Sequence, residues 1–164
     1  HDRLPVEQLV ALDLGTLDLG FVGVAPEKCP GKIALNSWRD ELLMAFLPLD
    51  HELAGKRRIN IEDLAEEPFI MISSEAAPSF SSMVYQMCRE AGFRPRVVQE
   101  ARRAQAVAAM TVAGSGVAIL PASLDRITGN GVPVWKGRES VRMTHFVAHP
   151  VEKTPVMKWF LELM

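Results

Sequence analysis

The sequence predicts an α/β protein with a parallel, doubly wound sheet. Between residues 68 and 120, short apolar segments rich in β-branched residues alternate with segments of helical spacing. In the clearest example, helix formers at residues 101–113 precede Gly114, and the apolar run 117–120 is stopped by Pro121. We therefore expect a helix, a tight Gly-Ser-Gly turn and a buried strand, in that order.

The order of these elements also limits the chemistry of the stretch. A dinucleotide fingerprint needs a strand, then glycines, then a helix N-terminus that receives the phosphate. Here the glycines follow a helix C-terminus, whose dipole has the wrong sign for an anion. A nucleophile elbow around Ser115 would likewise need a strand before the serine. The stretch is interpreted as a structural connection.

Length and composition indicate a globular chain. Its 164 residues are 48% hydrophobic, enough for one domain or two small lobes. The formal net charge of −2 argues against sequence-independent DNA binding by this chain alone. No apolar run approaches the roughly 18 residues of a membrane helix, so we expect no membrane partner. Cys29 and Cys88 lie far apart in the sequence, and we expect reduced thiols in a cytoplasmic protein.

Periodicity and breaker residues predict the other elements. A helix is expected from Pro5 to its stop at Gly15, followed by a buried strand within residues 17–24. The remaining expected strands are 33–35, the apolar half of 38–48, 68–72, 96–100, 132–135 and 142–149. Helical segments are expected at 61–64, after the serines near residue 80 up to Gly92, and at 154–164 with Val156, Trp159, Phe160 and Leu163 inward.

The titratable residues do not form an obvious catalytic or metal centre. His145 and His149 are about 13 Å apart along an expected strand, at roughly 3.3 Å per residue, so they cannot share a metal. His51 lies in a polar turn, and the acidic residues at 62–63 and 66–67 are typical of a solvated surface. We therefore expect no cofactor, no metal and no enzyme activity.

Four stretches resemble, in the same order, the effector-binding domain of LysR-type bacterial transcription regulators. They are Gln8-x-x-x-Leu12-x-x-Gly15-x-Leu-Asp-Leu-Gly-Phe21, Leu42-x-x-Ala-Phe-Leu-Pro48, Cys88-Arg-Glu-Ala-Gly-Phe-Arg-Pro95 and Ala113-Gly-Ser-Gly-Val-Ala-Ile-Leu-Pro-Ala-Ser123. The resemblance covers nearly the whole chain.

The resemblance implies two Rossmann-like lobes with mixed, mostly parallel sheets, similar to type II periplasmic binding proteins. Residues 1–39 and 133–164 would be part of lobe I, and residues 40–132 would form lobe II. We expect the first lobe to be incomplete, because in the resembled domain a strand, a helix and most of a second strand precede the first helix. A winged helix-turn-helix and a linker helix would lie further upstream.

The start of the helix near residue 80 is the main candidate binding site. Pro78, Ser79, Phe80, Ser81 and Ser82 combine hydroxyl groups, an aromatic ring and a helix N-terminus, which together suit a carboxylate or phosphate. The alternative is that these serines only cap the helix. The resemblance places this segment in a cleft between the lobes, where the effector binds.

Other candidate residues are implied by the resemblance on the opposite side of that cleft. They are Pro5 at a helix start, where relatives often have a hydroxyl residue, and Val22 and Gly23 at a strand end. Arg39 at the crossover could pair with an acidic effector, and Glu100 at the opening of the next helix is a further candidate. For both of them, an ordinary surface ion pair is the alternative.

The sequence is therefore interpreted as the effector-sensing and oligomerisation domain of a LysR-type regulator. The expected effector is a small organic acid, with an aromatic or muconate-like acid favoured, bound between the lobes. DNA would be bound only through an absent N-terminal winged helix-turn-helix, and a homo-oligomer, dimer or tetramer, is expected. The alternatives are a solute-binding protein of a transporter, which shares the architecture, and a small α/β enzyme.

Overall fold

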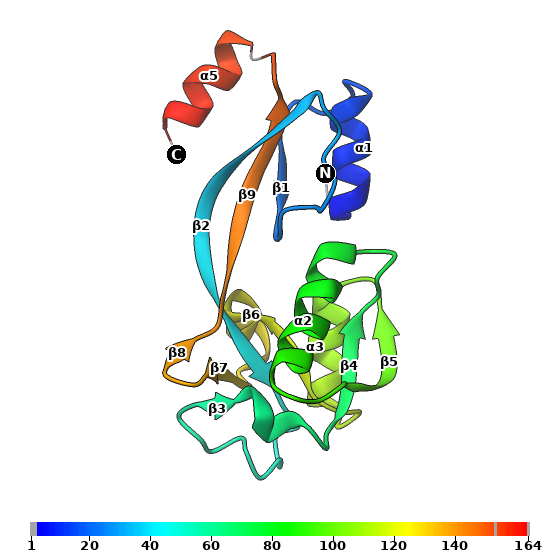
Figure 1. Cartoon of the computed structure of the whole chain (residues 1–164), viewed down its shortest axis with the longest axis vertical. Coiled ribbons are helices and arrows are strands. Elements are labelled where there is room, and N and C mark those ends of the chain that lie inside the picture. Colours follow the sequence, from blue (N-terminus) through cyan, green and yellow to red (C-terminus); the bar gives the residue numbers. More distant parts are fainter. Residues whose placement is uncertain (1–2, 153, 164) are drawn as a thin grey trace. The chain divides into compact units, whose positions relative to one another are not determined.

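The chain packs as two compact units (Figure 1). The computed structural model describes residues 3–152 and 154–163. Unit 1 comprises His1–Asp40 and Thr144–Met164, and unit 2 comprises Glu41–Met143. The first change of unit lies one residue after the position expected from the sequence. The second lies after β7 (Gly131–Lys136), which belongs to unit 2 because it pairs with other strands of that unit.

Unit 1 is built on three strands and two helices. α1 (Pro5–Asp13), β1 (Gly20–Val22) and α5 (Pro155–Glu162) lie entirely within it. It also holds the first part of β2 (Ile33–Phe46) and the end of β9 (Arg142–Pro150).

The core of unit 1 lies between α1 and the sheet. β1 pairs antiparallel with β9, and Leu12 of α1 packs with Ile33 and Ala148 in a buried cluster. The Gln8 side chain also joins helix to sheet, because its Oε1 accepts a 2.8 Å hydrogen bond from the backbone N–H of Phe21.

Unit 2 contains a larger mixed sheet. β4 (Pro68–Ile72) and β5 (Arg96–Ala101) are parallel, and Phe69 also forms a parallel bridge with Val117, just before β6 (Ala118–Pro121). β6 and β7 both pair antiparallel with β2. β7 pairs in turn with the two-residue strands β3 (Ile59–Asn60) and β8 (Glu139–Ser140).

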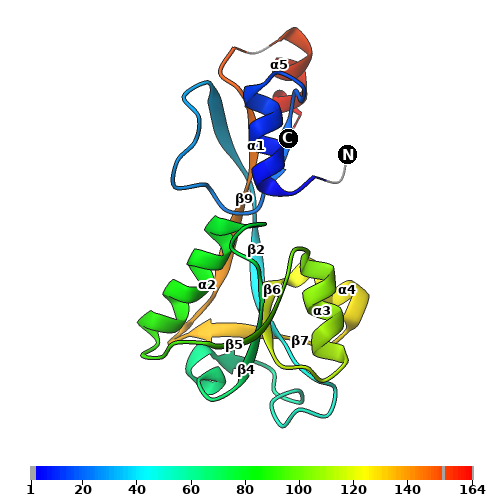
Figure 2. The same ribbon diagram turned by 90° about the vertical axis from the view of Figure 1, so that its right-hand side faces the viewer.

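Two helices cover the parallel part of this sheet (Figure 2). α2 (Pro78–Glu90) follows β4, and α3 (Ala104–Val112) follows β5. Figure 2 shows them on opposite sides of β4, as a doubly wound sheet requires. The short helices of the unit are η1 (Ile61–Leu64), η2 (Ala122–Leu124) and α4 (Asp125–Thr128). No helix in the described residues is long and apolar enough to cross a membrane.

Most expected elements are present, and the differences have physical reasons. Residues 33–35 and 38–46 form one strand, β2, which neighbours β9, β7 and β6 in the sheet. The strand expected within 17–24 is only three residues long.

The expected inward face of the C-terminal helix is wrong except at Phe160, which is half-buried. Val156, Trp159 and Leu163 are 72%, 63% and 66% exposed, whereas Met157 is 4% exposed. Apolar residues occupy almost the whole circumference of α5, so its sequence fits more than one orientation. The expected helix end at Met164 lies outside the described residues.

The Gly-Ser-Gly turn is the helix-to-strand connection expected from the sequence. Gly114 has a φ of +81°, and the backbone N–H of Ser115 donates to the carbonyl of Met110 at 3.0 Å. Gly116 has a φ of +151°, and a Cβ at this position would lie 2.4 Å from the carbonyl oxygen of Pro68. Only glycine lets residue 116 approach β4 this closely.

Gly116→Ala should therefore destabilise the chain by about 3–5 kcal/mol, from backbone strain and from displacement of β4. Gly114→Ala is the matched control: its φ is also positive, but an added Cβ meets nothing within 4 Å. The control should lose only about 1–2 kcal/mol. Urea unfolding of both variants measures the difference, and equal losses would contradict the close approach.

Candidate functional site

The candidate site of unit 2 lies at the carboxyl ends of β4 and β5. Because these strands are parallel and adjacent, the loops that follow them, and the N-termini of α2 and α3, lie at the same edge of the sheet. The backbone N–H of Ser73 donates to the carbonyl of Ala101 at 2.9 Å, which joins the two loops. Ligands of open α/β sheets bind at such an edge.

The serines at the start of α2 do not cap the helix. α2 begins at Pro78, its N-cap residue is Ala77, and no side chain caps it. Proline suits the first helical position because its fixed φ is helical. It also has no backbone N–H, and an N–H at this position would have no partner within the helix. Within the described residues, the structure gives no hydrogen-bond partner for the backbone N–H groups of Ser79 and Phe80. The positive end of the α2 dipole therefore still has donors available.

The five residues predicted at this helix start differ in their environments. Ser81 is 2% exposed, and its hydroxyl donates to the carbonyl of Ile72 at 2.7 Å, so it ties α2 to β4. Phe80 is 9% exposed and belongs to the core. Pro78 and Ser82 are exposed, and Ser79 is half-buried. Of the three serine hydroxyls, those of Ser79 and Ser82 remain suited to a ligand.

Ser73 is a further hydroxyl residue at this edge. Its carbonyl accepts hydrogen bonds from the backbone N–H groups of Ala76 and Ala77, both at 3.1 Å, which folds the loop back before α2. Its Oγ is buried and has no partner among the described residues. Unpaired buried polar atoms are uncommon in folded proteins, and an ordered water is one usual partner.

Charged residues lie in the same two loops. Arg102, after β5, lies 3.9 Å from the carboxylate of Glu75, before α2, measured from Nη1 to Oε2. Glu100 is exposed and lies in β5, opposite Met71, rather than at the opening of a helix, because α3 begins only at Ala104. The sequence prediction did not include Arg102 or Glu75, although the position of Arg102 two residues after the expected strand 96–100 was a usable signal.

The four candidates in unit 1 lie in or next to α1, β1 and β2. Pro5 is the first residue of α1, as expected. Val22 is 1% exposed and lies opposite Phe146 in the sheet, and Gly23 is half-buried. Arg39 lies just before the first change of unit, and its guanidinium carbon lies 4.6 Å from the centroid of the Trp38 ring. A role in binding stays a prediction for all four residues.

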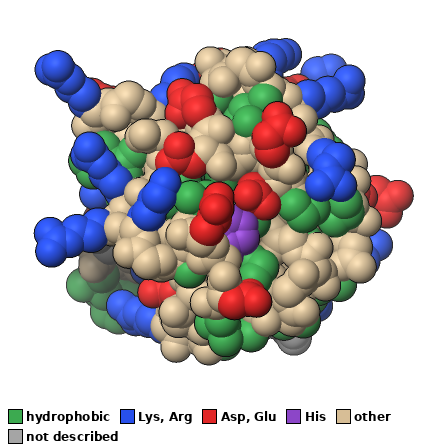
Figure 3. Space-filling model, turned by 90° about the horizontal axis from the view of Figure 1, so that it is seen from below, with side chains coloured by type: hydrophobic (Ala, Val, Ile, Leu, Met, Phe, Trp, Pro, Cys, Tyr) green, Lys and Arg blue, Asp and Glu red, His purple; other side chains and the backbone are tan. Residues whose placement is uncertain are grey.

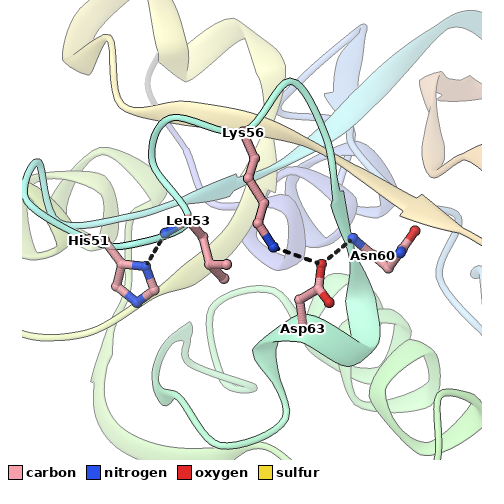
Figure 4. A network of polar contacts seen from close by, with 5 residues as sticks. All are labelled: His51, Leu53, Lys56, Asn60 and Asp63. Atoms are coloured by element: carbon pink, nitrogen blue, oxygen red, sulfur yellow. Dashed lines mark hydrogen bonds and ion pairs between the residues drawn. The ribbon is translucent and has the colours of Figure 1, made fainter.

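One face of the molecule gathers acidic side chains around a histidine (Figure 3). In unit 2, His51 Nδ1 accepts a hydrogen bond from the backbone N–H of Leu53 at 3.2 Å, and its Nε2 lies 3.3 Å from Glu67. Figure 4 shows the His51 turn beside the contacts of Asp63 with Lys56 and Asn60. Across residues 3–152 and 154–163, no group of three or more His, Cys, Asp or Glu could hold a metal ion.

The two cysteines are poor nucleophiles. Burial raises the pKa of the Cys88 thiol to about 11, and burial also raises the pKa of Cys29. At neutral pH both thiols therefore stay protonated, and the thiolate is the reactive form.

Comparison with known proteins decides the family. The model of the LysR substrate binding domain matches residues 3–164. The chain belongs to this family. Its fold is therefore that of the LysR effector-binding domains, which are similar to type II periplasmic binding proteins.

The relatives and solved structures agree with this assignment. The chain is 42% identical over 113 residues to the HTH-type transcriptional regulator AlsR of Bacillus subtilis (strain 168), covering 69% of this chain and 37% of that protein. HinK, a LysR family transcriptional regulator from Pseudomonas aeruginosa, has a TM-score of 0.82 at 21% identity, over 99% of this chain and 57% of that one. The BenM effector binding domain with its effector benzoate has a TM-score of 0.78 at 23% identity, over 98% and 73%.

Family membership limits the possible functions. The curated relatives are transcriptional regulators rather than enzymes. The chain spans less than half the length of the first of these relatives, so the activity of a whole regulator is a matter for proposal.

The two neighbouring serines of α2 provide a test of the site geometry. Ser81→Ala should cost about 1–3 kcal/mol of folding free energy, because it removes a buried hydrogen bond and leaves the Ile72 carbonyl unpaired. Ser82→Ala, at an exposed position, should change stability by less than about 0.5 kcal/mol. Chemical denaturation of the two variants measures this, and a neutral Ser81→Ala would show that the hydroxyl does not tie α2 to β4.

Proposed function

We propose that this chain is the sensing domain of a transcription regulator and that it binds a small organic acid at the carboxyl edge of β4 and β5. The observation that carries the proposal is the convergence of the α2 and α3 N-termini on this edge, in a chain of the LysR family. Binding would bias the conformation of the domain, and a coupling free energy of about 1–3 kcal/mol is enough to change the output of a regulator.

The hydrogen-bond donors of this edge favour an anion. The backbone N–H groups of Ser79 and Phe80 belong to the first turn of α2, at the positive end of the helix dipole. A carboxylate is stabilised at this end. The hydroxyls of Ser79 and Ser82 can add hydrogen bonds, and Arg102 adds a positive charge in the neighbouring loop. An organic acid matches this set better than a neutral or cationic molecule does.

An aromatic or muconate-like acid is the favoured effector. The relative whose effector domain was solved with benzoate supports an aromatic acid for this chain too. Phe80 would lie beneath the apolar part of such a ligand, and Glu100 would border the site from β5. A role in effector binding for Pro5, Val22, Gly23 and Arg39 of unit 1 stays a proposal that rests on the family alone.

A solute-binding protein of a transporter would share this fold. The curated relatives favour a regulator, because they are HTH-type transcriptional regulators. We therefore propose a cytoplasmic regulator whose DNA contacts come from a winged helix-turn-helix outside this chain.

Self-association is the second part of the proposal. α1 and its C-cap residue expose Val6, Val10 and Leu14 at 38%, 54% and 71%, and their spacing of four residues puts them on one face. An apolar stripe of this kind is suited to contact with a second copy of the chain.

Titration calorimetry with benzoate and with muconate tests ligand binding, and benzamide, which lacks the charge, is the matched control ligand. Both acids should bind at least about tenfold more tightly than benzamide, since a hydrogen bond to a charged group contributes about 1.5–3 kcal/mol. The double variant Ser79→Ala and Ser82→Ala should bind the acids several-fold more weakly while unfolding at the same denaturant concentration. Equal affinity for benzoate and benzamide would sink the anion site.

Sedimentation at high micromolar concentration tests self-association. The wild-type chain should form dimers or larger species, and Val10→Glu should shift the population toward monomer because it places a charge in the contact. Ile127→Glu is the control, since Ile127 is 72% exposed in α4, a helix of unit 2. A monomeric wild type, or equal effects of the two variants, would contradict a role for α1.

A further inference from the structure

Two oppositely charged side chains meet across the candidate site. Glu75 lies in the loop between β4 and α2, and Arg102 lies in the loop between β5 and α3. The Ser73 to Ala101 hydrogen bond holds these loops side by side, at 2.9 Å. Glu75 Oε2 consequently lies 3.9 Å from Arg102 Nη1, close enough for an ion pair.

This ion pair contributes little to the fold. The side chains of Glu75 and Arg102 are 85% and 62% exposed, so water screens their attraction. The loops are held instead by backbone hydrogen bonds from Ser73, Ala76 and Ala77. The guanidinium of Arg102 can therefore exchange Glu75 for another carboxylate without loss of structure.

We propose that Glu75 is an internal competitor for the effector: its carboxylate occupies Arg102 in the free protein, and the carboxylate of the ligand displaces it. This inference rests on the proposed function, since it assumes an anionic ligand at the carboxyl edge of β4 and β5. Arg102 then holds the ligand's carboxylate from the α3 side of the edge, opposite the N–H groups of α2. A guanidinium suits this role because it binds a carboxylate through two parallel hydrogen bonds.

The competition sets both the affinity and the selectivity of the site. Any ligand that binds Arg102 must replace the existing ion pair with Glu75. A ligand without an anionic group therefore gains no binding free energy from Arg102. A carboxylate gains the charge-assisted hydrogen bonds that Glu75 gives up. Glu75 thus lowers the affinity for acids moderately. High salt should weaken the ion pair between Glu75 and Arg102, because salt screens the attraction between exposed charges.

Three variants test the proposal by calorimetry with benzoate as the probe. Glu75→Gln should tighten binding about two- to fivefold, and Arg102→Gln should weaken it by about two- to tenfold, as expected for partly exposed charges. In the double variant, Glu75→Gln should have less effect than it has alone, because its influence acts through Arg102. Glu62→Gln, an exposed carboxylate in η1, is the matched control and should leave the affinity unchanged.

The outcomes separate this inference from the proposed function. If wild type binds benzoate but Glu75→Gln binds it equally well or more weakly, the competition is wrong and the binding site stands. Full additivity of the two substitutions in the double variant would also overturn the competition, since the Glu75 charge would then act on the ligand independently of Arg102. If neither benzoate nor muconate binds to wild type or to any variant, the proposed function itself fails.

Discussion

The sheet of unit 2 depends on two backbone hydrogen bonds made by Val117. Its N–H donates to the carbonyl of Pro68 at 2.8 Å, and its carbonyl accepts from the N–H of Ile70 at 2.8 Å. Through them β4 gains a neighbour on each side, β5 on one and the start of β6 on the other. The glycine before Val117 allows this approach. Without it, β4 and β5 would be an isolated pair, too small to hold two helix N-termini in place.

Local signals explain why most of unit 2 could be predicted. Glycine, proline and β-branched residues mark the ends and interiors of β4, α3 and β6, and these signals do not depend on distant contacts. The elements that differed are decided by tertiary packing. β2 continues through Asn36 and Ser37, whose low strand propensity gives no local signal that the strand is one piece. α5 has apolar residues on more than one face, so packing chooses the buried one.

The candidate site was predictable to the level of a segment and not of individual atoms. The sequence located the start of α2, since a serine cluster before an amphipathic run is a local pattern. It could not tell that Ser81 turns inward to a carbonyl of β4 while Ser82 faces solvent, because that depends on the rotation of the helix against the sheet. The neighbouring positions of Glu75 and Arg102 also follow only from the parallel pairing of β4 with β5.

The pairing of β5 with β4 contains an irregularity at Val98. Val97 lies opposite Phe69, but the next residue of β4, Ile70, lies opposite Gln99, so Val98 is an extra residue on the edge strand and is 44% exposed. A bulge of this kind bends an edge and makes it a poor template for further strands. It also absorbs the extra residue, so that Glu100 and Ala101 still lie opposite Met71 and Ile72. One residue can therefore be gained or lost at this point of the edge strand without turning the ligand-binding edge to the other face of the sheet.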